Sequence, residues 1–280
     1  MKRYVYASLM CFVLLAQNSA FAQSDEKIRG SRNVIVKQTY VDNFNTLILN
    51  GELSVNVVFN SKPSIEIEAD DNLHEVIIID VTDGILTLSQ SKRITSKKRL
   101  EITVNYSEPL EKMNISNEGE VRSLTTMELG DFSLTTADNT KAYLNINAKA
   151  FTFKSSGRSK TRLNLTADSS AIELLDDSKL EGLVNSKSVL LDMYQKADAV
   201  LEGRATTSTL RLSSSTDLDA RNFNIDSCSL QIEDNADISL SVAGSLTMKA
   251  AGKSDIYLYG SPNITIEEFT GSSKLQKKEG

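Results

Sequence analysis

The chain has little of what catalytic and disulfide-stabilised proteins commonly rely on. Its 280 residues include one histidine, two cysteines, three prolines and no tryptophan. His74 is the only possible imidazole base, and no Gly-x-Ser-x-Gly segment or glycine-rich phosphate loop accompanies it. Cys228 is the only cysteine outside the N-terminal apolar segment, so neither a disulfide nor a cysteine–histidine metal site is expected. We therefore predict no catalytic residue, no metal and no cofactor.

Positive charge is also in deficit. The sequence has 31 lysines and arginines against 37 aspartates and glutamates, and its net charge is −6. An acidic chain repels phosphate backbones, and no basic segment is interleaved with aromatic residues. Nucleic acid is therefore excluded as a partner.

The N-terminus has the three parts of a signal peptide over residues 1–22. Lys2 and Arg3 are followed by an apolar stretch from Tyr4 to Ala16 and by the small-x-small sequence of residues 20–22. A membrane anchor is the alternative, but the stretch is shorter than the ~20 residues that span a bilayer, and no later segment qualifies. We expect an exported protein that is periplasmic, on the outer surface or secreted, with no transmembrane segment after cleavage.

The strongest positive feature is an internal repeat that begins near residue 130. A small turn residue recurs every 18 to 20 positions, at Thr140, Ser159, Ser178, Ala197, Thr216, Ala236, Ser254 and Ser273. Apolar residues alternate with polar ones for several positions after each turn residue, and another apolar residue precedes it by six positions. Each repeat therefore predicts strand, turn and strand.

A repeat of about 19 residues is too short to bury its own apolar face, so successive repeats must stack. Parallel stacking at ~4.8 Å per step aligns residues of the same class in columns. We predict an all-β fold, a parallel β-helix of about 19-residue rungs over residues 130–275. The alternative is an antiparallel β-sandwich.

The part before the repeat is less regular. Asp83-Gly84 between two apolar runs predicts a tight turn, residues 92–99 an exposed loop, and residues 109–119 a seam. We expect a lead segment at residues 23–39 and one β domain at 40–277, whose irregular part is 40–118. Residues 23–118 form either a separate subdomain or irregular opening coils.

Four segments carry a family resemblance: DDNL at 70–73, VTDGILTL at 81–88, VNYSEPL at 104–110, and GKSDIYLYGSP at 252–262 with GSS at 271–273. In this order they are similar to the family of putative auto-transporter adhesin head domains, or GIN domains, over about residues 40–277. The resemblance implies a right-handed parallel β-helix, export in Bacteroidetes-type bacteria and an adhesive role. It brings no catalytic residues.

The turns depart from the Gly-Ser-Gly pattern of that family. Three of them keep the first glycine, and the others carry Asp138, Asp176, Gln195, Ser214 and Asp234 in its place. Aspartate tolerates a positive φ better than most residues, but glutamine does not. We therefore expect turn geometry to vary between rungs.

One charged position follows each turn residue, and stacking would align its members in a column. In order they are Lys141, Lys160, Lys179, Asp198, Asp217, Asp237, Asp255 and Lys274. The aspartates could recruit divalent cations and the lysines could attract an acidic glycan. The alternative is a solvated edge at which aspartate suits the turn chemistry.

Three tyrosines, Tyr143, Tyr257 and Tyr259, are predicted to face outward because they alternate with apolar residues. Exposed aromatic side chains stack on sugars or anchor a partner, and they also cap terminal rungs. Cys228 falls in an apolar column with Phe132, Phe151, Val189 and Leu246, so it is predicted to be buried.

We interpret the chain as a cell-envelope binding or adhesion module without catalytic activity, which meets a glycan or a surface protein. The candidate binding residues are Asp198, Asp217, Asp237, Asp255, Tyr257 and Tyr259. Two alternatives stay open. One is a polysaccharide lyase or hydrolase that uses carboxylates on adjacent rungs, such as Asp198 with Asp217, and the other is a structural envelope protein. The sequence leaves the oligomeric state open.

Overall fold

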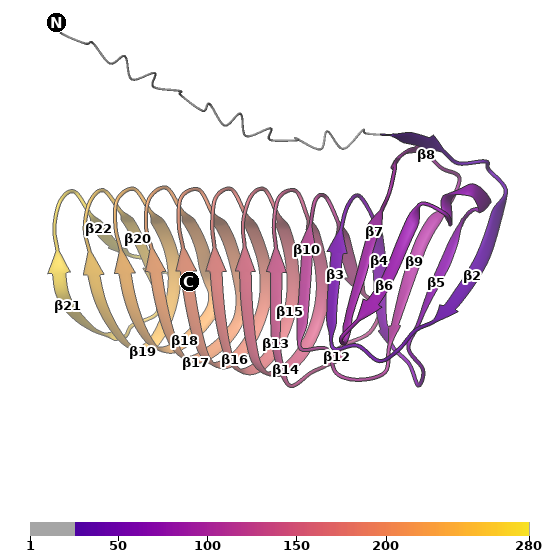
Figure 1. The fold of residues 1–280 in the computed structure, drawn as a ribbon. Coiled ribbons are helices and arrows are strands. Elements are labelled where there is room, and N and C mark those ends of the chain that lie inside the picture. Colours follow the sequence, from indigo (N-terminus) through magenta and orange to yellow (C-terminus); the bar gives the residue numbers. More distant parts are fainter. Residues whose placement is uncertain (1–25, 280) are drawn as a thin grey trace, which may run out of the picture.

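The computed structural model describes residues 26–279, and the predicted signal peptide lies outside this range. The described chain stacks into a long rod of coils, and its only helix is the one-turn 3-10 helix η1 (Asp71–Leu73) (Figure 1). No helix within residues 26–279 is long and apolar enough to cross a membrane. The longest strands each make most of one coil: β14 (Lys141–Ser155), β15 (Lys160–Leu174), β16 (Lys179–Met193), β17 (Asp198–Leu212), β18 (Asp217–Ile232) and β19 (Asp237–Ala250).

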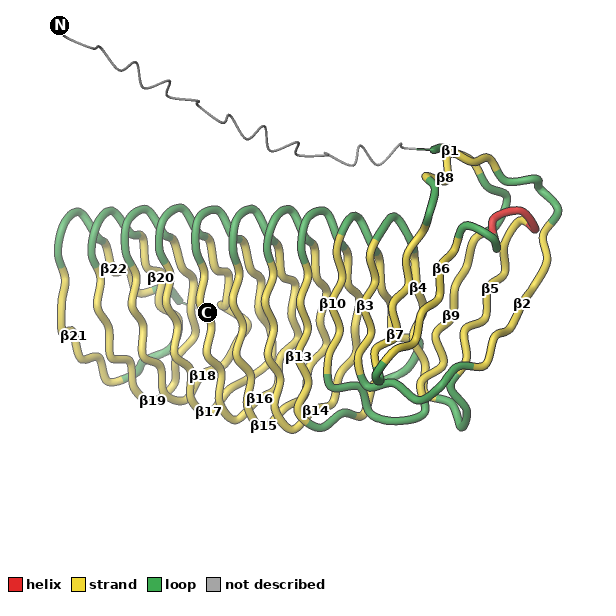
Figure 2. Tube along the Cα trace, in the orientation of Figure 1, coloured by secondary structure: helices red, strands yellow, loops and turns green. Residues whose placement is uncertain are grey.

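The rod has two faces, because the turns line one edge and the strands curve around the opposite edge (Figure 2). Face 1 holds the strands that follow each turn: β4 (Ser54–Phe59), β11 (Glu120–Ser123), the first halves of β14 to β19, β20 (Asp255–Tyr259) and β22 (Lys274–Lys277). Face 2 holds β3 (Thr46–Asn50), β10 (Lys112–Ser116), β13 (Asp131–Thr136), the second halves of β14 to β19, and β21 (Asn263–Phe269). The short β12 (Met127–Glu128) pairs with β14.

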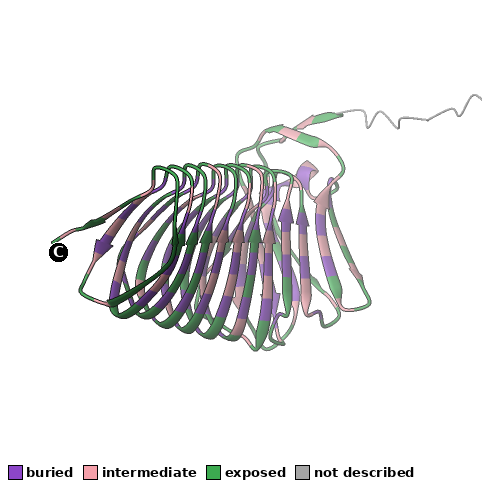
Figure 3. Ribbon diagram, turned by 90° about the vertical axis from the view of Figure 1, so that its left-hand side faces the viewer, coloured by how far each residue is buried: buried purple, intermediate pink, exposed green. Residues whose placement is uncertain are grey.

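Parallel pairing in register confirms the predicted β-helix. Leu144 lies opposite Leu163, and Leu163 lies opposite Gly182, as the 19-residue spacing requires. All strand pairs from β13 to β22 are parallel, so the β-sandwich alternative is wrong. Buried and exposed residues alternate along the coils (Figure 3). One inward column, at most 2% exposed, consists of Leu134, Phe153, Ile172, Leu191, Leu210, Leu230 and Met248.

One repeat, from Thr216 to Ala236, has 20 residues instead of 19 and accommodates the extra residue in a β-bulge. Between β17 and β18 the pairing steps from Val200–Asp219 to Glu202–Asn222, which leaves an extra residue in β18. Arg221 lies at this bulge, is exposed, and donates from Nε to Asp219 Oδ1 at 2.9 Å. Arg221 therefore projects into solvent, and the inward column of Leu210, Leu230 and Met248 is back in register after the bulge.

All turns of the regular coils share one backbone conformation, so the prediction that turn geometry varies is wrong. The φ of the position two before each turn residue lies between 60° and 85°, and Gln195 has 65° where Gly157 has 68°. A left-handed conformation costs a residue with a Cβ roughly 1–2 kcal/mol. Stacking imposes it, because main-chain N–H groups bond to the turn below, as from Ser215 to the Gln195 carbonyl at 2.8 Å.

Hydrogen bonds from the side chains explain why aspartate and glutamine occupy this left-handed position. Asp176 Oδ2 accepts from the main-chain N–H of Gly157 at 2.8 Å, and Asp234 Oδ2 accepts from that of Ser214 at 3.0 Å. Gln195 Oε1 accepts from the N–H of Asp176. Each side chain thus satisfies a donor in the preceding turn, which glycine cannot do.

Strands that fold back close the N-terminal end of the rod. On face 1, β9 (Leu100–Tyr106) pairs in parallel with β4, and β5 (Ser64–Asp70) and β2 (Val34–Tyr40) follow in antiparallel order. On face 2, β7 (Ile85–Gln90) pairs with β3, and β6 (Ile77–Thr82) joins β7 through the predicted Asp83-Gly84 turn. Leu73 and Val76 are buried at this end and complete the cap.

The exposed loop expected at residues 92–99 is wrong, because these residues contain the strand β8 (Arg93–Ser96), which pairs with β1 (Lys27–Arg29). Residues 109–119, where a seam is predicted, contain β10, which pairs with β3 and β13. The partners β1 and β3 precede these segments by many residues. Local composition therefore carried no sign of the pairing.

Asp70 fastens the first described segment to this cap. Its side chain is fully buried, and its carboxylate accepts main-chain hydrogen bonds from Arg32, Lys98 and Arg99, each at 3.1 Å. Burial raises the pKa of the Asp70 carboxyl, but the three N–H donors outweigh burial and hold the pKa below its ordinary value. Gly30 passes so close that a Cβ there would lie 2.0 Å from the carboxylate.

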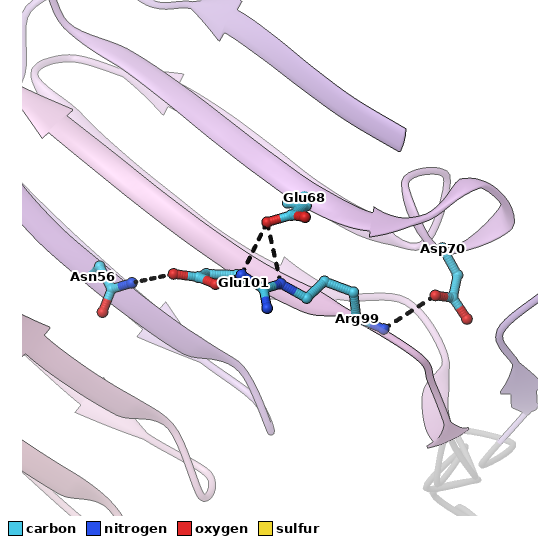
Figure 4. Close-up of polar contacts among 5 residues, drawn as sticks. All are labelled: Asn56, Glu68, Asp70, Arg99 and Glu101. Carbon is cyan, nitrogen blue, oxygen red and sulfur yellow. Dashed lines mark hydrogen bonds and ion pairs between the residues drawn. The ribbon is translucent and has the colours of Figure 1, made fainter. Parts of the chain in front are cut away.

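The side chain of Arg99 extends this anchor across β5 and β9 (Figure 4). Its Nε donates to Glu68 at 3.1 Å, and its Nη2 donates to Glu101 at 2.5 Å. Glu101 also accepts from Asn56 Nδ2 of β4 at 3.2 Å. Asp70, the first residue of the DDNL segment, therefore has a structural role.

Replacing Ser214 by glycine is expected to stabilise the protein by about 0.5–1 kcal/mol, because Ser214 has a φ of 70° and its hydroxyl bonds to no described residue. Asp176→Gly is the matched control, since it relieves the same strain but removes the bond to Gly157. It is expected to gain less or to destabilise. Urea denaturation measures both, and equal gains would contradict a contribution from the side-chain bonds.

Candidate binding face

The predicted column of charges exists and follows the edge of face 1 beside the turns. Lys179 lies opposite Asp198, which lies opposite Asp217, and the column continues in register through Asp237 and Asp255. Four aspartates are therefore consecutive along the rod, about one strand spacing apart.

Lysines neutralise both ends of this aspartate column. Lys179 Nζ donates to Asp198 Oδ2 at 2.5 Å, and Lys274 Nζ lies 3.5 Å from Asp255 Oδ1. Asp237 Oδ1 accepts from the main-chain N–H of Asp255 at 3.1 Å. In the described chain, Asp217 and Asp237 in the middle of the column form no salt bridge, and Arg221 is the cation that acts on Asp217 from nearby.

Asp217 is the most electrostatically crowded member. Burial and the nearby carboxylates of Asp198 and Asp237 raise the pKa of its carboxyl. Within residues 26–279, no group of three or more histidine, cysteine or acidic side chains has the arrangement of a metal site. Cation binding by this column stays a prediction.

The three tyrosines face outward from face 1 and are half-buried. Arg122 Cζ lies 4.0 Å from the ring centroid of Tyr143, and Lys278 Nζ lies 4.7 Å from that of Tyr257. Tyr259 lies two residues beyond Tyr257 on β20. Tyr257 and Tyr259 therefore stand at the C-terminal end of the rod, and Tyr143 stands several coils away.

Cys228 and His74 have structural surroundings. Cys228 is 5% exposed, and burial raises the pKa of its thiol to about 12, which confirms the prediction of a buried cysteine. His74 Nε2 lies 3.3 Å from the carbonyl oxygen of Ile35 and so links the end of η1 to β2.

A first hollow on face 1, which we call the apolar hollow, lies around Tyr143 and has a volume of about 710 Å³. Its lining includes three exposed apolar side chains, Leu124, Leu183 and Val200, at 56%, 44% and 45% respectively. Its polar lining consists of Arg122, Ser123, Asn145, Arg162, Asn164, Glu181 and Glu202. Across one coil, Arg162 Nε donates to Glu181 at 2.7 Å.

A second hollow, the polar groove, runs along the curved edge of face 1 and has a volume of about 690 Å³. It is lined by amides, hydroxyls and charges that stack in register, at Asn147, Thr166, Asn185, Arg204 and Asn224. Lys187 lies 2.7 Å from Asp168 at its margin, and their hydrogen bond lowers the pKa of the Asp168 carboxyl. None of the four column aspartates lines either hollow.

Sequence reasoning missed both hollows, although the repeat contained their signal. The fifth position after each turn residue is asparagine in two consecutive coils, at Asn145 and Asn164. The seventh position after the turn residue is polar in four consecutive coils, at Asn147, Thr166, Asn185 and Arg204, and these residues line the polar groove. Exposed Leu183 and Val200 fall at outward positions of the alternation, where an apolar residue stands out only after the coils are aligned.

Asp217→Asn is expected to raise the thermal unfolding midpoint at pH 7. The pKa of the Asp217 carboxyl is raised in the folded protein above its ordinary value of 3.8, so the ionised carboxyl lowers the free energy of unfolding. This cost disappears as the pH falls below the folded and the unfolded pKa, because the carboxyl is then protonated in both states. The gain should therefore shrink toward pH 3. Asp198→Asn, which loses the contact with Lys179, is the matched control and is expected to gain nothing at pH 7. Equal gains at both pH values would contradict the electrostatic explanation.

Three solved structures with the same fold come from Parabacteroides species. A putative adhesin from Parabacteroides distasonis has a TM-score of 0.68 at 17% identity, covering 90% of this chain and 100% of that chain. A putative adhesin from Parabacteroides merdae has a TM-score of 0.64 at 17% identity, covering 90% and 99%. A putative lipid binding protein from Parabacteroides distasonis has a TM-score of 0.61 at 13% identity, covering 90% of this chain and 100% of that chain.

No curated protein matches the sequence. One family model does, in two overlapping stretches, residues 43–183 and 155–262. Together they take in all the long coils and most of the N-terminal cap, so the match covers well over half of the chain. The chain therefore belongs to the family described as putative auto-transporter adhesin, head GIN domain.

Proposed function

We propose that the protein is an exported, non-enzymatic adhesion module that binds a glycan at the apolar hollow of face 1. Membership of an adhesin-type family supports adhesion, and with the signal peptide expected at residues 1–22 it supports a place outside the cytoplasm. The observation that carries the choice of site is the apolar hollow itself, where exposed apolar side chains lie beside polar and charged ones.

The composition of the hollow suits a sugar better than a wholly polar or a wholly apolar ligand. A sugar ring presents C–H groups on its faces and hydroxyls at its edge. Tyr143, Leu183 and Val200 supply apolar contact for a ring face, and Arg162 and Asn164 supply donors for the hydroxyls. The guanidinium of Arg122 holds the Tyr143 ring in place, which lowers the entropy lost on binding.

The enzyme alternative has less support. Asp198 and Asp217 are adjacent in register, as an acid/base pair on neighbouring rungs requires, but Lys179 pairs with Asp198 and neither aspartate lines a hollow. Release of reducing ends or unsaturated products from a panel of acidic and neutral polysaccharides would overturn the non-enzymatic assignment.

A second candidate site lies at the other end of face 1, where Asp198, Asp217, Asp237 and Asp255 approach Tyr257 and Tyr259. The aromatic pair and the acidic column lie on neighbouring outward positions of β20. This group would suit a cationic or cation-bridged partner on a cell surface.

A glycan array with two double variants tests the proposal. Tyr143→Ala combined with Arg162→Ala is expected to weaken binding at least about tenfold, because it removes the ring contact and a charged donor together. Both residues face outward, so the far-UV circular dichroism spectrum should not change.

The matched control is Tyr257→Ala with Tyr259→Ala, which alters two aromatic residues on the same face but outside the hollow. Binding should survive this change. Loss of binding with the control pair alone would move the site to the C-terminal group, and binding unaffected by either pair would contradict a site on the tyrosines of face 1.

A further inference from the structure

The C-terminal end of the rod presents unpaired strand edges on both faces. β21 pairs with β19, β22 pairs with β20, and no other described strand pairs with either of them. The outer main-chain N–H and C=O groups of these two strands therefore meet solvent. Such an edge is a template for another strand.

The last coil also leaves the end of the core uncovered. Ile264 lies opposite Leu246 and Ile266 lies opposite Met248, so both isoleucines continue inward columns. Leu246 and Met248 are fully buried, whereas Ile264 and Ile266 are 45% and 50% exposed. Phe269, on the same strand, is 42% exposed.

The two ends of the rod differ in how the hydrophobic core is covered. At the N-terminal end, antiparallel strands fold back, and Leu73 and Val76 seal the core. Within residues 26–279, the C-terminal end has no comparable cap. Edge strands of soluble proteins are usually blunted or covered, so this edge calls for a specific cover.

Charge on the last coil is divided between the faces. Near its end β21 carries two exposed carboxylates, Glu268 and Glu267, and Glu267 lies 3.4 Å from Lys249 Nζ. β22 begins with exposed Lys274, which lies 3.5 Å from Asp255, and continues to Lys277. A surface with one acidic edge and one basic edge is complementary to a second copy of itself, provided that the copy is turned so that unlike edges meet.

We propose that the cover is a second copy of this chain, joined end to end in a two-fold symmetric dimer. A two-fold axis that runs parallel to the strands places β21 of each copy on β22 of its partner, in antiparallel order. Glu267 and Glu268 then lie near Lys274 across the interface, twice, and the half-exposed isoleucines of the two cores meet. The interface is isologous, so it closes at two copies.

Such a dimer places the N-terminal caps at opposite ends of a doubled rod. Face 1 of one copy continues into face 2 of the other, since each β22 meets the β21 of its partner. The two apolar hollows therefore lie on opposite sides of the assembly, which is suited to bridging two surfaces.

Sedimentation velocity over a wide concentration series tests the dimer with the full exported chain. A dimer that dissociates on dilution is expected. Ile264→Lys should raise its dissociation constant at least about tenfold. Ile78→Lys is the matched control, because Ile78 is 44% exposed on β6 at the other end of the rod, and it should change nothing.

A charge swap gives a second test, with the thermal unfolding midpoint followed alongside, because Lys274 also lies beside Asp255. Glu268→Lys and Lys274→Glu should each weaken the dimer, and the double variant should restore it. A monomer at every concentration, a dimer unaffected by Ile264→Lys, or an equal effect of Ile78→Lys would each overturn the proposal.

Discussion

Main-chain hydrogen bonding between equivalent residues of successive coils governs the whole structure. Once Lys141 is fixed opposite Lys160, every later position of both coils has its partner, and each side chain stacks on one of similar kind. The inward columns form a continuous core, and the described chain contains no disulfide. Outward columns become chemically repetitive surfaces by the same mechanism, which is how single asparagines and arginines become a groove.

The same constraint overrides local preference where the two conflict. Gln195 accepts a left-handed φ because its neighbours in the stack leave no other path, and its side chain then bonds to Asp176. The extra residue of the 20-residue repeat leaves the stack at Arg221 for the same reason. The constraint fails only at the ends. One end has a built cap held by Asp70, and the other exposes Ile264 and Ile266.

Much of the fold could be predicted from the sequence, because stacked coils require similar residues at a constant spacing along the chain. The regular coils, the burial of Cys228 and the charged column all follow from spacing alone. Pairings between distant segments, such as β1 with β8, have no period and could not be predicted. The apolar hollow was missed because its residues are unremarkable one at a time, and only the alignment of Tyr143, Arg162 and Glu181 in neighbouring coils gives it meaning.

The central claim is that each residue lies directly opposite its equivalent in the next coil. Distances between pairs of spin labels, measured by pulsed electron–electron double resonance, test it most directly. A spin label at Lys141→Cys is combined in turn with one at Asp217→Cys, Asp237→Cys or Asp255→Cys, while buried Cys228 stays unlabelled. Stacking in register predicts narrow distance distributions that lengthen by about 5 Å with each additional coil. Distances that stay constant or change irregularly along this series would contradict it.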